Sequence, residues 1–197
     1  MIPGSPGDSF AALLTAAYPA VAMRILLTAF LVGQVLLSHA VQLRVFGPVT
    51  DLETRAPLAD VLVRVYKDGV KQKVLHTGVN GHYSFVLDNG SSYILRFSLP
   101  GRVTKCYAID THGPSWEDDN RIVDLSIEMT LFPTVPGLDL TFFDLPMGIA
   151  RFTPMTGYLS WNDTYAQDIR SEVDRLMAEV AHRRQAIASV DQRTLHQ

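Results

Sequence analysis

The strongest constraint on the fold is a series of turn signals placed at short, regular intervals between segments that alternate apolar and polar residues. Asp68-Gly69, Asn80-Gly81 and Asp88-Asn89-Gly90 divide residues 60–99 into four such segments. Asn-Gly and Asp-Gly accept the positive φ angles of tight hairpin turns, and strict alternation is typical of a strand with one buried face. The predicted strands span residues 60–67, 70–77, 82–87, 92–99, 103–109 and 122–131. We expect a single antiparallel β-sandwich of about seven strands.

A set of short motifs follows in fixed order between residues 42 and 110. They read G-P-V-T-D at 47–51, A-P-L at 56–58, V-L-V-R-V at 61–65, N-G-H-Y-S-F at 80–85 after Thr77, and Y-I-L-R-F at 93–97 before Pro100-Gly101. This string resembles the carboxypeptidase regulatory-like domain family, which has a transthyretin-like β-sandwich. The sequence departs from the family at Pro48, after the first glycine, and at Arg102, where an aromatic residue is common. The resemblance implies a non-catalytic accessory or adhesion-type module of exported and cell-envelope bacterial proteins.

Some relatives of the transthyretin scaffold are enzymes that hydrolyse 5-hydroxyisourate. Those enzymes depend on histidine and arginine side chains and on a C-terminal Tyr-Arg-Gly-Ser, and this tetrapeptide is absent from the sequence. His82 stands beside the Asn80-Gly81 turn, a place typical of a solvent-facing histidine. We therefore expect no enzymatic activity and name no catalytic residue.

Residues 1–40 have the features of an export signal. Residues 25–37 form an apolar run about as long as a signal-peptide core and shorter than the roughly 20 residues that a membrane span needs. Met23-Arg24 precedes this run, and Ser38-His39-Ala40 places small residues where a signal peptidase reads them. We expect a signal peptide region at 1–40, with translation starting at Met23. An uncleaved anchor helix over residues 10–37 is the alternative, although Pro19 interrupts it.

Export would place the cleaved chain in the periplasm, at the cell envelope or outside the cell, with no stable membrane span. The residue directly after Ala40 is not a cysteine, which excludes a lipoprotein anchor. The chain carries 17 Lys and Arg against 20 Asp and Glu, so it lacks the basic field that nucleic-acid binding needs. The single cysteine, Cys106, permits neither an internal disulfide nor a cysteine-rich zinc site, and we expect a buried, inert thiol. No cofactor is predicted.

A proline-rich apolar extension at 132–162 follows the predicted sandwich of residues 41–131. Its 132–156 part holds four prolines among apolar side chains such as Phe142 and Phe143. The prolines exclude a regular helix, and the apolar content is too high for a solvated linker. We expect this segment to wrap the sandwich or to dock on a partner.

Residues 163–197 form a C-terminal helix and tail, with the helix predicted at 164–188 and Asn162 or Asp163 as its N-cap. Apolar residues at helical spacing form one narrow stripe on an otherwise charged surface: Ile169, Val173, Leu176, Met177 and Val180. About two heptads are too few for a free-standing coiled coil. The stripe is our candidate partner-binding site, for an envelope protein, and docking on the chain's own sandwich is slightly favoured over partner binding.

Exposed aromatic side chains on a β-sandwich can stack on sugar rings. The candidates for glycan binding are Tyr107, Trp116, Tyr158 and Trp161. The alternation, however, assigns most aromatic residues to the inner face of a sheet, where they close the core. Glycan binding is therefore the alternative to protein binding.

Two groups of residues could bind a metal ion, but neither has the spacing of a known site. His76 and His82 flank a hairpin turn and lack a third ligand. Residues 117–120 read Glu-Asp-Asp-Asn and offer oxygen ligands, without the alternation and glycine of a helix-loop-helix calcium loop. We predict no metal site.

These features together predict a non-catalytic exported binding module. It would act as an accessory component of a cell-envelope assembly, contacting a protein partner through a sheet edge, the apolar extension or the helix. Carbohydrate binding by the exposed aromatic residues is the second hypothesis.

Overall fold

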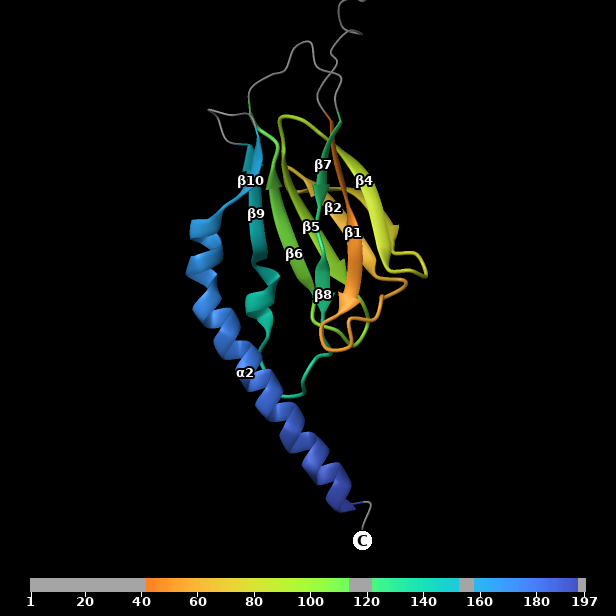
Figure 1. The fold of residues 1–197 in the computed structure, drawn as a ribbon, viewed down its shortest axis with the longest axis vertical. Coiled ribbons are helices and arrows are strands. Elements are labelled where there is room, and N and C mark those ends of the chain that lie inside the picture. Colours follow the sequence, from red (N-terminus) through yellow and green to blue (C-terminus); the bar gives the residue numbers. More distant parts are fainter. Residues whose placement is uncertain (1–41, 114–121, 153–157, 195–197) are drawn as a thin grey trace, which may run out of the picture. The chain divides into compact units, whose positions relative to one another are not determined.

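The computed structural model describes residues 42–113, 122–152 and 158–194, and in this part of the chain ten strands form two sheets (Figure 1). The smaller sheet contains β4 (His82–Asp88), β1 (Gln42–Asp51) and β7 (Ile122–Ser126) in that order, with β8 (Met129–Leu131) also paired to β1. The larger sheet has the order β10 (Leu159–Trp161), β9 (Pro146–Phe152), β6 (Lys105–Asp110), β5 (Ser92–Ser98), β2 (Leu62–Lys67), β3 (Val70–His76). The predicted β-sandwich is confirmed.

The hairpin turns and the alternation that predicted β2 to β5 are both present. Asp68 and Gly69, between β2 and β3, have φ angles of 49° and 79°, in the region that their residue types tolerate. Every second residue of β4 and of β5 is buried. The two strands lie in opposite sheets, and Tyr83 of β4 meets Phe97 of β5 edge to face at 5.1 Å between ring centroids. The alternating side chains therefore interdigitate across the sandwich.

The sandwich differs from the prediction in being mixed, with more strands than seven. β7 and β8 lie parallel to β1, and β9 lies parallel to β6. The predicted strand at 122–131 is two strands, separated at residues 127–128, although Ile127 keeps the inward side of the alternation and is 3% exposed. The Ile127 backbone passes close to Gly47, where a Cβ would lie 2.1 Å from the Ile127 carbonyl oxygen.

Residues 132–162, which the sequence set apart from the sandwich, supply part of the larger sheet. They contain a 3-10 helix, η2 (Thr141–Asp144), and strands β9 and β10. The buried positions of β9 are Gly148, Ala150 and Phe152. Two of these three side chains are too small to mark an alternating pattern, which explains why the sequence did not predict the strand.

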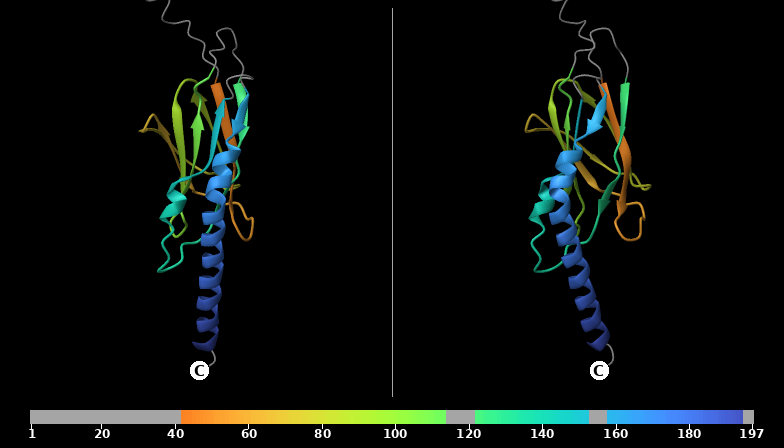
Figure 2. Two further views of the ribbon diagram at one scale, coloured as in Figure 1. Left: turned by 90° about the vertical axis from the view of Figure 1, so that its left-hand side faces the viewer. Right: turned by 60° about the vertical axis from the view of Figure 1, so that its left-hand side comes forward.

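The C-terminal helix, α2 (Asp163–Thr194), runs beside the sandwich, and its last turns continue past the end of the strands (Figures 1 and 2). The side-chain oxygen of Asn162 accepts a hydrogen bond from the Tyr165 amide at 3.1 Å, which confirms Asn162 as the N-cap. The helix ends at Thr194 and not at residue 188 as predicted. No helix in the described part of the chain combines the length and hydropathy that a membrane crossing needs.

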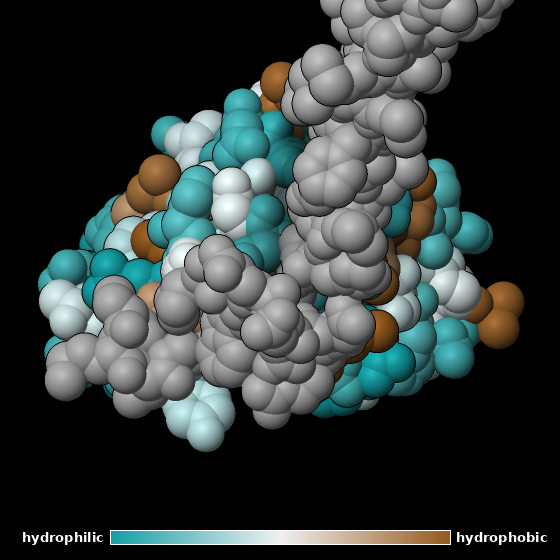
Figure 3. Space-filling view, turned by 90° about the horizontal axis from the view of Figure 1, so that it is seen from above, coloured by the Kyte–Doolittle hydropathy of each residue, from teal (hydrophilic) through white to brown (hydrophobic). Residues whose placement is uncertain are grey.

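Figure 3 looks onto the end of the sandwich opposite the C-terminal end of α2. Where this end is not drawn in grey, apolar residues appear as separate brown spots between polar ones. Isolated apolar residues of this kind are ordinary on a protein surface.

Candidate functional site

Helix α2 closes one open side of the sandwich with the apolar stripe that the sequence predicts. Leu176 and Val180 are 4% and 1% exposed and belong to a second core cluster. The other buried members of that cluster are Val103, Phe132, Val135 and Phe143. Arg184, one turn after Val180, forms an ion pair with Glu53 in the loop that follows β1. The helix is thus held to the sandwich by both apolar and charged contacts.

The stripe therefore packs on the chain's own domain, which is one of the two arrangements expected from the sequence; its assignment as a partner-binding site stays a prediction. Leu176 and Val180 have no surface to offer a partner in this arrangement. Ile169, Val173 and Met177 are half-buried along the same contact. The physical reason is that the extension brings Phe132 and Phe143 to this side of the sandwich, where the apolar face of α2 covers them.

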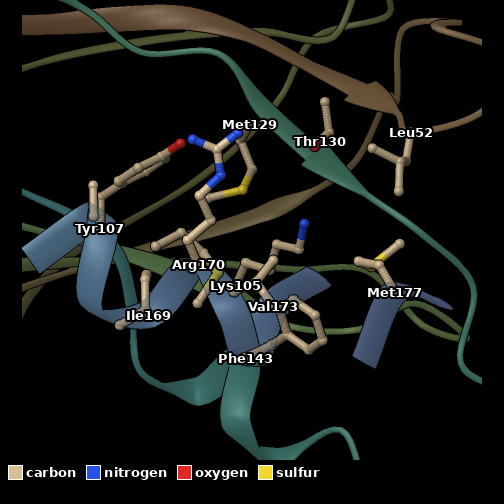
Figure 4. A pocket seen from close by; sticks show the side chains of 12 residues that line it. Leu52, Lys105, Tyr107, Met129, Thr130, Phe143, Ile169, Arg170, Val173 and Met177 are labelled. Atoms are coloured by element: carbon tan, nitrogen blue, oxygen red, sulfur yellow. The ribbon is translucent and has the colours of Figure 1, made fainter. Parts of the chain in front are cut away.

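A cavity of about 340 Å³ remains between α2 and the two sheets, and we call it the helix pocket (Figure 4). Its walls come from β6, β8, η2, β9 and α2, and from the loop after β1. The side chains that define it are Leu52, Lys105, Tyr107, Met129, Thr130, Phe143, Met147, Ala166, Ile169, Arg170, Val173 and Met177. The pocket is mostly apolar, with two basic side chains and no acidic one among these residues. Its volume falls at the lower end of the roughly 300–1,000 Å³ typical of ligand sites.

Lys105, at the start of β6, is a buried cation in the wall of the helix pocket. Only 8% of the residue is exposed, and its Nζ lies 5.0 and 5.3 Å from the ring centroids of Phe132 and Phe143. Burial lowers the pKa of the Lys105 amine from 10.5 to about 8, because the charged form loses its hydration. Within the described part of the chain no carboxylate forms an ion pair with it. At neutral pH the amine is therefore mainly charged and lacks an anionic partner there.

The predicted glycan-binding aromatics do not form one exposed platform. Tyr107 and Trp161 pack against each other with ring centroids 5.5 Å apart. Gly148 lies beneath both rings, and a Cβ at that position would come within 3.1 Å of each. Trp161 is 39% exposed and Tyr158 is 75% exposed, whereas Trp116 lies outside the described residues. The structure thus brings together one pair of the four.

The remaining candidates are ordinary structural residues where they are described. Cys106 is buried, as predicted, and its Sγ lies 3.3 Å from the Asp144 carbonyl oxygen. Burial raises the pKa of this thiol, which makes it a poor nucleophile. Across the described ranges no three His, Cys, Asp or Glu side chains are grouped as a metal site would require. The acidic segment 117–120 and the signal region 1–40 lie outside the described residues.

The outer face of the larger sheet carries an apolar row that sequence reasoning missed. Strand register places Tyr66 of β2 beside Ile94 of β5, Ile94 beside Ala108 of β6, and Ala108 beside Ile149 of β9. None of these four side chains is fully buried, and Ile94 is 36% exposed. In the sequence these residues are only single apolar positions on the outward, mostly polar side of each strand. They form a row only when the strand register aligns them.

The chain matches no protein-family model, and no curated protein matches its sequence. Among solved structures it is similar to 3-chlorocatechol 1,2-dioxygenase from Rhodococcus opacus 1CP, with 13% identity and a TM-score of 0.36 over 48% of this chain and 61% of that one. It is also similar to the TIE protein of Bacillus anthracis, with 15% identity and a TM-score of 0.37 over 48% of this chain and 18% of that one.

A third similar structure is the C-terminal domain of the shaft pilin SpaA from Lactobacillus rhamnosus GG. It shares 12% identity and a TM-score of 0.34, over 47% of this chain and 98% of that one. The chain thus spans less than two thirds of the first two structures. Likeness this distant says nothing about activity.

Proposed function

We propose that the protein is a non-catalytic binding module of the cell envelope that contacts a partner protein through the outer face of its larger sheet. The apolar row of Tyr66, Ile94, Ala108 and Ile149 is the observation that supports this most directly. The outward positions of a half-buried sheet ordinarily carry polar residues. An apolar row that crosses four adjacent strands is the kind of surface that proteins use for association.

Basic residues next to this row indicate the chemistry of the partner. In the neighbouring row, Arg64 of β2 lies between Val74 of β3 and Arg96 of β5. Arg96 forms an ion pair with Asp144, whereas Arg64 has no ion pair in the described part of the chain and is the basic group left for a partner. Val74 is 48% exposed and extends the apolar surface toward the edge strand. We therefore expect a partner surface with an apolar centre and acidic residues at its rim.

Site-specific photo-crosslinking in the cells that naturally make the chain tests this proposal. A photoreactive residue at position 94 is compared with one at position 86 on β4, the outward face of the smaller sheet. The two positions are a matched pair, since Ile94 is 36% and Val86 is 38% exposed.

We expect position 94 to crosslink one discrete envelope protein and position 86 to crosslink none. The same products at both positions, or none at either, would contradict the proposed binding face. Recovery of the chain in the cytoplasmic fraction alone would contradict the envelope location.

Glycan binding is the second candidate, supported by the exposed aromatic residues at β10. Trp161 and Tyr158 lie three positions apart and are 39% and 75% exposed. A sugar ring stacked on Trp161 would shift its fluorescence emission. Titration with envelope polysaccharides, with Trp161→Leu as the control, is expected to show a saturable shift only if this surface binds glycans.

A further inference from the structure

The helix pocket has the composition of a site for a ligand that is mostly apolar and carries a negative charge. Its α2 wall extends from Ala166 to Met177, about 16 Å at the helical rise of 1.5 Å per residue. Met129, Met147 and Met177 contribute flexible thioether side chains to the walls. Methionine surfaces adapt to ligands of varying shape, and an elongated apolar space of this length suits one aliphatic chain.

Lys105 supplies the positive charge with which the negative group of such a ligand would pair. Its side chain enters the pocket between β8 and α2, with the amine pointing into the open space (Figure 4). The pocket-lining residues include no carboxylate, and the ammonium group lies near the rings of Phe132 and Phe143. A buried charge without a counter-ion is unfavourable, and an anionic group on a ligand would remove that cost.

Arg170 provides a second cation at the rim of the same pocket. Its side chain is 78% exposed, and its Nε lies 3.9 Å from Asp174, at the limit of an ion pair. Figure 4 shows its guanidinium group directed toward the hydroxyl of Tyr107. An anion entering the pocket therefore passes an exposed arginine before it reaches the buried lysine, and both charges favour its entry.

We propose that the helix pocket binds a single-chain aliphatic carboxylate, with the carboxylate on Lys105 and the chain between Met129 of β8 and the α2 side chains Ile169 and Val173. A pocket of about 340 Å³ suits one such chain. The site lies between the sheets and α2, apart from the outer face proposed for the protein partner. A result that contradicts one proposal therefore leaves the other unaffected.

Calorimetric titration of the full chain tests the proposal with three probes of equal chain length: dodecanoate, dodecanol and dodecyl phosphate. We expect dodecanoate to bind about 10- to 100-fold more tightly than dodecanol, the ratio that a charge-assisted hydrogen bond provides. Each CH₂ removed from the carboxylate is expected to weaken binding about fourfold. Tighter binding of dodecyl phosphate than of dodecanoate would overturn the assignment to a carboxylate.

Three variants locate the binding. Lys105→Met removes the charge and keeps the apolar walls, so it is expected to abolish the preference for dodecanoate and to retain dodecanol. Lys73→Met, on the exposed strand β3, is the matched control and should bind as wild type does. Val173→Trp fills the pocket from α2 and should abolish binding of both probes. It also provides the test if circular dichroism shows that Lys105→Met does not fold.

The proposal is overturned if the wild type binds neither dodecanoate nor dodecanol, or binds these two probes equally. It is also overturned if a folded Lys105→Met variant keeps the preference, or if Val173→Trp binds as wild type does. Because all variants share residues 1–40, any binding by that apolar segment cancels in the comparison.

Discussion

Replacing Lys105 with methionine is expected to stabilise the unliganded protein at neutral pH. The structure buries the ammonium group beside Phe132 and Phe143, and in the described part of the chain it has no carboxylate partner. Burial without a counter-ion disfavours the charged form. Methionine has a similar length and is unbranched, so it can occupy the same space without a charge.

The magnitude follows from the pKa of the Lys105 amine, which falls from 10.5 to about 8 on folding. One pH unit corresponds to about 1.4 kcal/mol, so keeping the folded amine protonated at pH 7 costs about 3 kcal/mol. We therefore expect Lys105→Met to raise the free energy of unfolding by about 3 kcal/mol at neutral pH.

The pH dependence has a definite sign. Because the unfolded chain binds this proton more tightly than the folded protein, the stability of the wild type rises as the pH increases from about 8 toward 10.5. Below about 8 the full cost is present. The advantage of the methionine variant should therefore shrink by about 2 kcal/mol between roughly pH 7 and pH 9.5.

Urea denaturation followed by circular dichroism measures both quantities, with Lys73→Met on the exposed strand β3 as the control for removal of one lysine charge. A Lys105→Met variant that is less stable than wild type at neutral pH would refute the reasoning. So would a stability difference that stays constant up to pH 9.5, because either result would mean that the amine is solvated or paired in the folded protein.

Three further predictions concern the packing of the fold. Gly47→Ala should destabilise the protein by about 3 kcal/mol in urea denaturation, because its Cβ would collide with the Ile127 carbonyl oxygen. Unchanged stability would mean that Gly47 and the Ile127 backbone lie further apart than this. Leu176→Ala should cost about 3 kcal/mol and expose α2 to limited proteolysis; an unchanged cleavage pattern would contradict the docked helix. Asp51 accepts amide hydrogen bonds from the loop after β1, pairs with Arg102, and has a lowered pKa. Asp51→Asn should therefore cost about 2 kcal/mol at neutral pH and less in acid, where the wild-type carboxylate is also neutral; an equal cost at pH 7 and at low pH would contradict this.

The sequence predicted the elements whose signals are local. The turns at Asp68-Gly69 and Asn80-Gly81 require a backbone geometry that few residues tolerate, and the structure places turns there. The helix was also predicted from local signals, with Asn162 or Asp163 as its N-cap, and the structure shows Asn162 in that role. Each of these signals depends on residues close together in the chain, so no knowledge of distant contacts is needed to interpret them.

The sequence could not predict which segments become neighbours. β9 pairs with β6 in parallel, with Cys106 opposite Pro146, 40 positions further along the chain, and its buried glycine and alanine carry no alternating signal. The apolar row on the outer face exists only once four strands are aligned in register. A single residue in each strand is unremarkable until the other three lie beside it.

The helix pocket likewise depends partly on local sequence signals and partly on contacts between distant segments. The sequence by itself determined that a narrow apolar stripe on α2 needs a surface to cover it, since a helix of this composition is not stable alone. Only the tertiary structure decided that the surface is the chain's own extension, and that Lys105 faces the space left between them. Alternation assigns Lys105 to the inner face of β6, but its burial and its lowered pKa arise from rings and helix residues brought together by folding.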